Sequence, residues 1–343
     1  MPLVTDYRQV KDIYQEAAER RVGLPVFCME DRETLEAVLA AAAEIGKRIG
    51  RDDVPVIPAW TARYPGRGQM TLLTACGDPV LGTRLMFSDL AAMTSGSSPY
   101  RRLRVLPHLD HAFPWLDGDV MDAFADAFAS IMCDASERPF SENVRLTAEF
   151  VDRVRGRVVV EGAVDEISES GSGAPKNDPT TVEQARRFLD GTGVDIIVPN
   201  VGTEHRATAD QVRYRGDRAR EISAAVGRIL CLHGTSSVAA GDLAGLVDDG
   251  FVKINIYTTL AVHGGQAVAR QVLDTIGDLF GEADLRELVA EGLLGNRVLD
   301  RATPPRPRLA SVANPPRRDA WFRAVRDRCL EFFEAFGYGR WAA

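Results

Sequence analysis

The sequence predicts an α/β protein built as a (β/α)₈ (TIM) barrel, with a Pro/Arg-rich segment and a further helix after the barrel. Three observations support this prediction. Short apolar, β-branched runs occur eight times, amphipathic stretches separate most of them, and no glycine-rich turn follows the first run. The eight runs span 24–29, 54–60, 103–109, 129–133, 158–164, 194–201, 228–233 and 251–257.

Strands that are apolar along their whole length are typical of a parallel sheet buried on both faces. The alternative to a barrel is a doubly wound open sheet, in which a glycine-rich phosphate-binding turn is expected after the first strand. Here the first run, 24–29, is followed by EDRETLEAV. The barrel is therefore the favoured architecture.

Four of the separating stretches have clear helical character. Apolar residues of 33–49 repeat every three or four positions. Ser141 is expected to cap the start of a helix over 141–155, and 180–193 ends with glycines that suit a helix stop. The segment 241–250 is a shorter version of the same pattern.

The end of the chain differs from the barrel units. Residues 301–318 hold five prolines and five arginines, so neither a helix nor a central strand is expected there. Residues 319–339 carry aromatic and aliphatic side chains at helical spacing and should pack on the barrel or on a partner subunit. We therefore divide the chain into a barrel, 1–275, and a C-terminal extension, 276–343.

Composition excludes several classes of protein. The chain has 343 residues, 45% hydrophobic and 26% charged, and its formal net charge of −8 argues against a nucleic-acid binder. No apolar run approaches the roughly 18 residues of a membrane span, and the N-terminus lacks the apolar core of a signal peptide. Five scattered cysteines without a CxxC pair fit reduced thiols. We expect a cytoplasmic protein with neither a membrane nor a nucleic-acid partner.

Four of the five histidines lie at or just beyond the ends of predicted strands: His108, His111, His205 and His233. The carboxyl ends of barrel strands converge on one face, where active sites are built. Three neutral imidazoles suffice for a catalytic zinc ion with an open coordination position. Each histidine taken alone is more often a core or surface residue, but their shared placement predicts a metal site.

Asp110 stands between two of these histidines, His108 and His111. In a regular strand it would face away from His111, but the geometry relaxes near a strand end. A carboxylate beside a metal but not bound to it can act as a general acid or base. The alternative role is to accept a hydrogen bond from a histidine N–H.

Several segments together resemble the class II, zinc-dependent fructose-bisphosphate and ketose-bisphosphate aldolases. The resemblance rests on PHLDHAFPW, SIMCDASERPFSENV, VVVEGAV, DPTTVEQARRFLDGTGVDIIVPNVGTEH, LCLHGTSS and FVKINIYTT. The N-terminal VFCMEDRETLEAVLAAAAE also fits, and the match runs in order from about residue 8 to 270.

The resemblance implies roles for individual residues. His111, His205 and His233 match the family's zinc ligands, and Asp110 matches its acid/base aspartate. Glu169 is the nearest candidate for the family's proton-moving loop glutamate. Substrate contacts are expected from Thr61, Arg206, Gly234, Ser236, Asn255 and Tyr257, and His108, Asp134 and Glu161 are expected around the metal.

The implied chemistry is the making or breaking of a C–C bond next to a ketone on a sugar-like substrate. Zn²⁺ or another divalent ion would polarise the carbonyl and stabilise an enediolate, and the resemblance adds a monovalent cation as a further ligand. The resemblance also implies a homodimer or homotetramer. No Schiff-base lysine is needed. Only four of the 41 basic residues are lysines, and Lys253 alone lies near the predicted site, inside the last strand.

Departures from the family pattern gather around the substrate. HGGSG is replaced by HGTSS from His233 onward, an aspartate of NIDTD is replaced by Tyr257, and Arg206 stands where the family has glycine. Glycines in such loops let backbone N–H groups approach a phosphate. An inward-facing Arg206 would favour a carboxylate or a repositioned phosphate, whereas an outward-facing one would pair with Glu204 or Asp210.

These observations favour a metal-dependent aldolase, a lyase whose substrate differs from fructose 1,6-bisphosphate. A metal-dependent epimerase or isomerase on the same scaffold is the first alternative, because it needs the same enediolate but releases no aldehyde. A barrel that has lost catalysis and serves as a binding or regulatory subunit is the second. Because Asp110 and all three zinc histidines are present, that second alternative is disfavoured.

Overall fold

The computed structural model describes residues 3–167, 178–205, 213–302 and 308–342. Eight parallel strands form a closed barrel, because the first strand pairs with both the second and the last. The eight barrel strands are β1 (Leu24–Cys28), β2 (Pro55–Thr61), β4 (His108–Ala112), β5 (Ser130–Cys133), β6 (Val159–Ala163), β7 (Ile196–Val198), β8 (Leu230–Leu232) and β9 (Phe251–Ile256). A ninth, two-residue strand, β3 (Arg104–Val105), pairs with β2. The predicted (β/α)₈ barrel is confirmed.

The strand predicted over 103–109 is divided into β3 and β4, and both pieces pair with β2. Pro107 lies in the gap, where its missing N–H cannot continue the ladder. Apart from Arg104, the residues of these nine strands are buried, as expected of a sheet covered on both faces.

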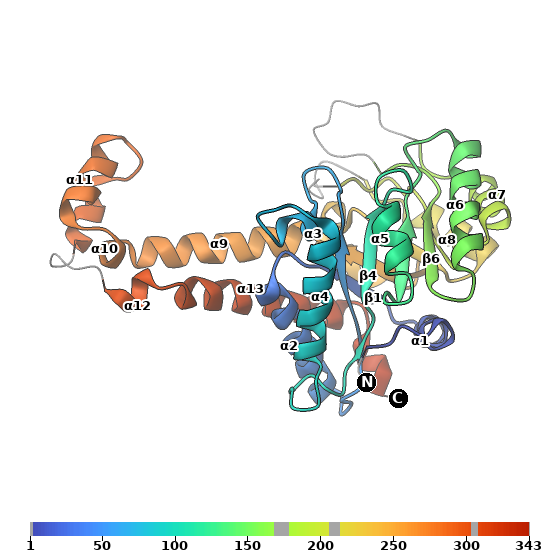
Figure 1. Ribbon diagram of the computed structural model, residues 1–343, viewed down its shortest axis with the longest axis horizontal. Coiled ribbons are helices and arrows are strands. Elements are labelled where there is room, and N and C mark those ends of the chain that lie inside the picture. The colour runs from blue at the N-terminus through green and yellow to red at the C-terminus, as the bar shows by residue number, and fades with distance from the viewer. Residues whose placement is uncertain (1–2, 168–177, 206–212, 303–307, 343) are drawn as a thin grey trace.

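Helices surround the barrel and follow its strands (Figure 1). One helix, α1, precedes the first strand. The α-helices of the barrel are α1 (Tyr7–Arg20), α2 (Arg32–Arg48), α3 (Gln69–Leu72), α4 (Pro79–Met93), α5 (Gly118–Ala123), α6 (Phe140–Val154), α7 (Val182–Thr192) and α8 (Gly216–Val226), and the 3₁₀ turns after β8 are η1 (Thr235–Ser237) and η2 (Ala240–Leu246).

Local signals explain most helix ends. Thr181 and Gln184 form the reciprocal hydrogen bonds of a capping box at the start of α7, and Gly193 ends that helix in the left-handed conformation. The cap predicted at Ser141 is wrong, because α6 starts at Phe140 and Pro139 takes the cap position. The short helix predicted over 241–250 is a 3₁₀ helix at 240–246.

The C-terminal part of the chain forms an arm beside the barrel (Figure 1). Helices α9 and α13 run side by side, and the shorter elements lie at the far end of the arm. The elements of the arm are α9 (Thr258–Asp274), α10 (Ile276–Leu279), α11 (Glu282–Ala290), η3 (Asn296–Arg301), α12 (Leu309–Val312) and α13 (Pro315–Ala335), and η4 (Tyr338–Ala342) returns to the barrel.

The predicted final helix is present but begins at Pro315, inside the Pro/Arg-rich segment where no helix was expected. Pro315 and Pro316 occupy its first turn, where backbone N–H groups need no intrahelical acceptor. Another helix, the four-residue α12, also lies in that segment. In the part of the chain that the structure describes, no helix has both the length and the apolar character needed to cross a membrane.

Helix α13 packs against α2 and α9 of its own chain. The ring of Phe333 is fully buried and meets the ring of Phe27, on β1, edge-on at 5.3 Å between centroids. Gly264 permits the close approach of α9, because a Cβ atom there would lie 2.6 Å from the Trp321 ring. The base of the arm is therefore joined to the hydrophobic core of the barrel.

We expect Phe333→Ala to lower the free energy of unfolding by about 3–5 kcal/mol, because truncation of a buried phenylalanine leaves a cavity in the core. Leu309→Ala is the matched control, since Leu309 is 80% exposed and its truncation should change stability little. Urea titration followed by circular dichroism measures both variants. Equal losses from the two substitutions would contradict this account of how α13 is anchored.

Candidate active site

Three histidines from separate barrel segments converge at the carboxyl end of the strands. His111 lies on β4, His205 follows β7 and His233 follows β8, and one ring nitrogen from each lies within 4.8 Å of the others. The His111 ring centroid is 5.2 Å from that of His205 and 4.7 Å from that of His233. The structure thus brings together the three histidines that were predicted to hold a metal.

A backbone irregularity in β4 turns His111 toward this cluster. The pairing of β4 with β5 shifts register between Leu109 and Ala112, and His111 has φ +45°. Such a bulge adds a residue to one strand and re-aims the side chains beyond it. His108, Asp110 and His111 can therefore all face the barrel interior, which a regular strand would not allow.

The hydrogen bonds of His111 and His233 fix where their lone pairs lie. His111 Nδ1 is 2.7 Å from Asp134 Oδ2, and His233 Nε2 is 3.3 Å from Glu161 Oε1. Because a carboxylate only accepts, each of these nitrogens carries the proton. The remaining nitrogens, His111 Nε2 and His233 Nδ1, are 3.1 Å apart with lone pairs toward each other.

This arrangement fits a shared metal ion. Two lone pairs repel unless a cation lies between them, and two nitrogens bound to tetrahedral zinc at about 2.0–2.1 Å are roughly 3.3 Å apart. His205 Nε2 is buried and has no hydrogen-bond partner among the described residues. Burial lowers the pKa of His205 well below its usual value and also lowers that of His233, so both imidazoles are neutral near pH 7.

Glu161, Cys231 and His233 form a second group with metal-ligand spacing. Two features make it a poorer site than the histidine cluster. Burial raises the pKa of the Cys231 thiol well above its usual value, so it does not offer a thiolate. The Glu161 carboxylate is already paired with the Lys253 ammonium at 2.5 Å.

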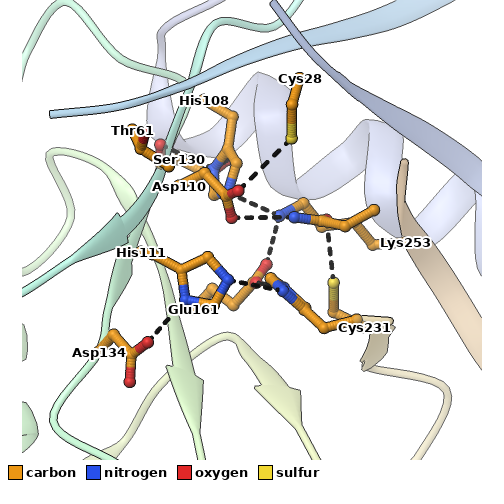
Figure 2. Close-up of polar contacts among 12 residues, drawn as sticks. Cys28, Thr61, His108, Asp110, His111, Ser130, Asp134, Glu161, Cys231 and Lys253 are labelled. Atoms are coloured by element: carbon orange, nitrogen blue, oxygen red, sulfur yellow. Dashed lines mark hydrogen bonds and ion pairs between the residues drawn. The ribbon is translucent and has the colours of Figure 1, made fainter. Parts of the chain in front are cut away.

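Asp110 lies beside the histidine cluster and is almost fully buried. Its Oδ1 accepts a hydrogen bond from Asn255 Nδ2 at 2.9 Å, and its Oδ2 accepts one from the Arg67 guanidinium at 3.1 Å. The Cys28 thiol also faces Oδ2, at 3.5 Å (Figure 2). Burial alone would raise the pKa of Asp110, but the surrounding histidines and Arg67 hold it well below its usual range.

Beneath this site, a buried network fills the barrel interior. Lys253 Nζ bonds His108 Nε2 at 2.9 Å and pairs with Glu161 (Figure 2). Glu161 also accepts from His233 Nε2, so it links the lysine to that histidine. Burial would lower the pKa of Lys253, but Glu161 raises it above its ordinary value. Both groups are charged at neutral pH, and removing one partner would leave the other buried and unpaired.

The cavity above the network is lined by most of the predicted substrate residues. They include Gly234, Ser236, Asn255 and Tyr257. Gly234 is required by its surroundings, because it has φ +71° and a Cβ atom would lie 2.8 Å from the carbonyl oxygen of Glu204. Thr235 Oγ1 donates to the carbonyl of Asn255 at 2.6 Å and joins this loop to β9.

Thr61 does not line this cavity, so the structure does not support its predicted substrate contact. The side chain is fully buried, its N–H donates to Gln69 Oε1 at 2.8 Å, and its hydroxyl donates to the carbonyl of Arg67. Thr61 therefore fixes the loop after β2. Glu169 and Arg206, the other predicted site residues, lie outside the described residues.

Several cavity residues were not predicted from the sequence, and Cys28, Tyr64 and Arg67 are the ones that contact the predicted site residues Asp110, His111 and Tyr257. Tyr64 and Arg67 belong to the loop after β2, and the Tyr64 ring centroid lies 4.7 Å from that of His111. A signal was present, because loops after barrel strands build the active face. Arg67 could not be singled out from the sequence, because arginine is abundant throughout the chain.

Comparisons with known proteins agree with this fold. The YdjI aldolase of Escherichia coli K12 superposes with a TM-score of 0.62 at 21% identity, covering 98% of this chain and 97% of that one. The fructose-bisphosphate aldolase of Campylobacter jejuni gives a TM-score of 0.69 at 19% identity, covering 97% and 95%. At such low sequence identity, these superpositions show a shared fold and no more. The model of the class II fructose-bisphosphate aldolase family matches residues 8–298, and the chain belongs to that family.

Proposed function

We propose that this protein is a metal-dependent aldolase that makes or breaks a C–C bond next to a ketone. The observation that carries the proposal is the cluster of His111, His205 and His233 with the buried Asp110 beside it, at the carboxyl end of the barrel strands. Family membership supports the same reaction class.

The metal held by the three histidines is proposed to be Zn²⁺. When bound, it would polarise the ketone carbonyl and offset the negative charge that develops after cleavage. Asp134 orients His111 through its Nδ1–H, and Glu161 orients His233 through its Nε2–H. These carboxylates keep the ligating nitrogens unprotonated.

Asp110 is the proposed acid/base group. Its low pKa keeps the carboxylate ionised near neutral pH, so it can accept the proton of a substrate hydroxyl during cleavage and return it during bond formation. Asn255 and Arg67 hold its two oxygens in place, so little reorientation is needed when the proton moves.

The substrate is proposed to be an anionic, sugar-like molecule other than fructose 1,6-bisphosphate. The support is the altered lining of the cavity, where Tyr257 and the HGTSS loop stand in place of the family's residues. Glu169 and Arg206 remain proposed for proton transfer and substrate binding.

We also propose a cytoplasmic homodimer or homotetramer. All five cysteines are unpaired, as in reducing compartments. The arm exposes large apolar side chains, Leu273, Phe280 and Leu293 among them, which a partner subunit could cover.

Purified protein should contain about one equivalent of divalent metal, and His205→Ala should lose it because one of three ligands is removed. His263→Ala is the control, since His263 lies exposed on α9. Elemental analysis of the dialysed proteins measures both. A fully active protein without metal, or one that chelators leave unaffected, would contradict the proposal.

Asp110→Asn should keep metal and fold but lower kcat by about 10²–10⁴-fold, because a positioned acid/base group contributes that much. Asp119→Asn serves as control, since Asp119 is ion-paired with Arg63 away from the cavity. If Asp110→Asn lost metal yet kept its rate per bound metal, Asp110 would be a support for the histidines and not the acid/base group.

A panel of ketose phosphates and phosphorylated keto-sugar acids should identify the substrate by aldehyde release, which also separates an aldolase from an epimerase. We expect kcat/KM for fructose 1,6-bisphosphate to lie about tenfold or more below the best substrate, the cost of one lost charged hydrogen bond. Efficient cleavage of the bisphosphate would show that the altered loops bind phosphate as in the rest of the family.

A further inference from the structure

Arg67 is a buried arginine at the edge of the proposed active site. It lies on the loop between β2 and α3, is 6% exposed and lines the cavity beside Asp110. Two bonds hold its loop to the end of β2, since Thr61 donates its hydroxyl to the Arg67 carbonyl and its N–H to Gln69. The position of Arg67 is therefore set by the barrel.

Two aromatic rings hold the guanidinium group of Arg67. Its central carbon lies 5.2 Å from the centroid of Tyr64 and 4.5 Å from that of Tyr257, distances typical of cation–π contacts. The Tyr257 hydroxyl donates to Glu30 Oε1 at 2.6 Å, which fixes that ring. Aromatic rings position the cation without neutralising it, whereas a carboxylate side chain at 257 would neutralise it.

The hydrogen-bonding capacity of Arg67 is only partly used. One terminal nitrogen bonds Asp110 Oδ2 at 3.1 Å, but Nε is buried and has no partner among the described residues. A buried charged donor normally has an acceptor, and the planar guanidinium favours oxyanions that can accept two bonds. Asp110 cannot fill this role alone, because Asn255 and Cys28 also engage its oxygens.

We propose that Arg67 is a specificity-determining residue that binds an oxyanion, a carboxylate or a phosphate, carried by the substrate. The proposal rests on the aldolase function, in which Asp110 takes the proton of the hydroxyl group that becomes the aldehyde oxygen. Because Arg67 is hydrogen-bonded to Asp110, the oxyanion that it binds belongs to the aldehyde half of the substrate. A competing account gives Arg67 the single role of orienting Asp110.

Binding of small probes to the metal-loaded protein tests this directly. D-glycerate, glycerol 3-phosphate and neutral glycerol share a carbon skeleton and differ in the oxyanion. Isothermal titration calorimetry should show that wild type binds at least one anionic probe more tightly than glycerol, and that Arg67→Leu weakens this binding by about tenfold or more. The probe that loses more affinity identifies carboxylate or phosphate as the preferred group.

Two further variants make the comparison specific. Arg63→Leu removes an arginine of the same loop that pairs with Asp119, and it should bind the probes as wild type does. Arg67→Lys keeps the charge without the planar fork and should retain part of the affinity, even if the leucine variant is poorly folded. Equal binding by wild type, Arg67→Lys and Arg67→Leu, or no preference of wild type for an anion, would overturn the proposal.

Kinetics separates oxyanion binding from orientation of Asp110. In the direction of C–C bond formation, Arg67→Leu should raise KM for an anionic aldehyde acceptor and leave KM for neutral glyceraldehyde unchanged. A fall in kcat alone, equal for both acceptors, would support the orienting role and overturn the proposal.

Arg67-dependent probe binding without any aldol reaction would support the oxyanion site and contradict the proposed function. Aldolase activity with Arg67-independent binding would overturn the oxyanion site alone.

Discussion

The left-handed backbone of His111 is the constraint on which the active face depends. A residue other than glycine at φ +45° has a backbone strained by about 1–3 kcal/mol. Without this conformation, the regular alternation of β4 would point His111 away from the interior that His108 and Asp110 face. The hydrogen bond from His111 Nδ1–H to Asp134 helps to stabilise this conformation. One bulged residue thus places a metal ligand beside a proton-transfer group.

The charges beside this bulge are paired within the barrel. Lys253 and Glu161 are both fully buried and contact each other, and His108 and His233 satisfy their remaining polar atoms. Asp110 is surrounded in the same way by Arg67 and Asn255. Because desolvation of an unpaired ion is so unfavourable, this pairing fixes which groups are charged and which imidazoles are neutral.

The arm and the loop after β2 show how the barrel supports parts outside its strands. Phe333 anchors α13 to β1 through the Phe27 ring, and Gly264 lets α9 approach Trp321. The next residue of β1, Cys28, faces Asp110 in the barrel interior. The carboxyl ends of the strands thus face the cavity, while helices that include the base of the arm cover their outer sides.

Sequence by itself determined the barrel, the order of its strands and the identity of the histidine cluster, because apolar periodicity and residues at strand ends are local signals. Only the tertiary structure decided how His111 joins Asp110 on one face, since a bulge depends on pairing with β5. It also decided that Thr61 fixes a loop, that Arg67 enters the cavity and that α13 begins at Pro315. These features depend on contacts between residues far apart in the chain or on the exact start of a helix, which composition and spacing do not encode.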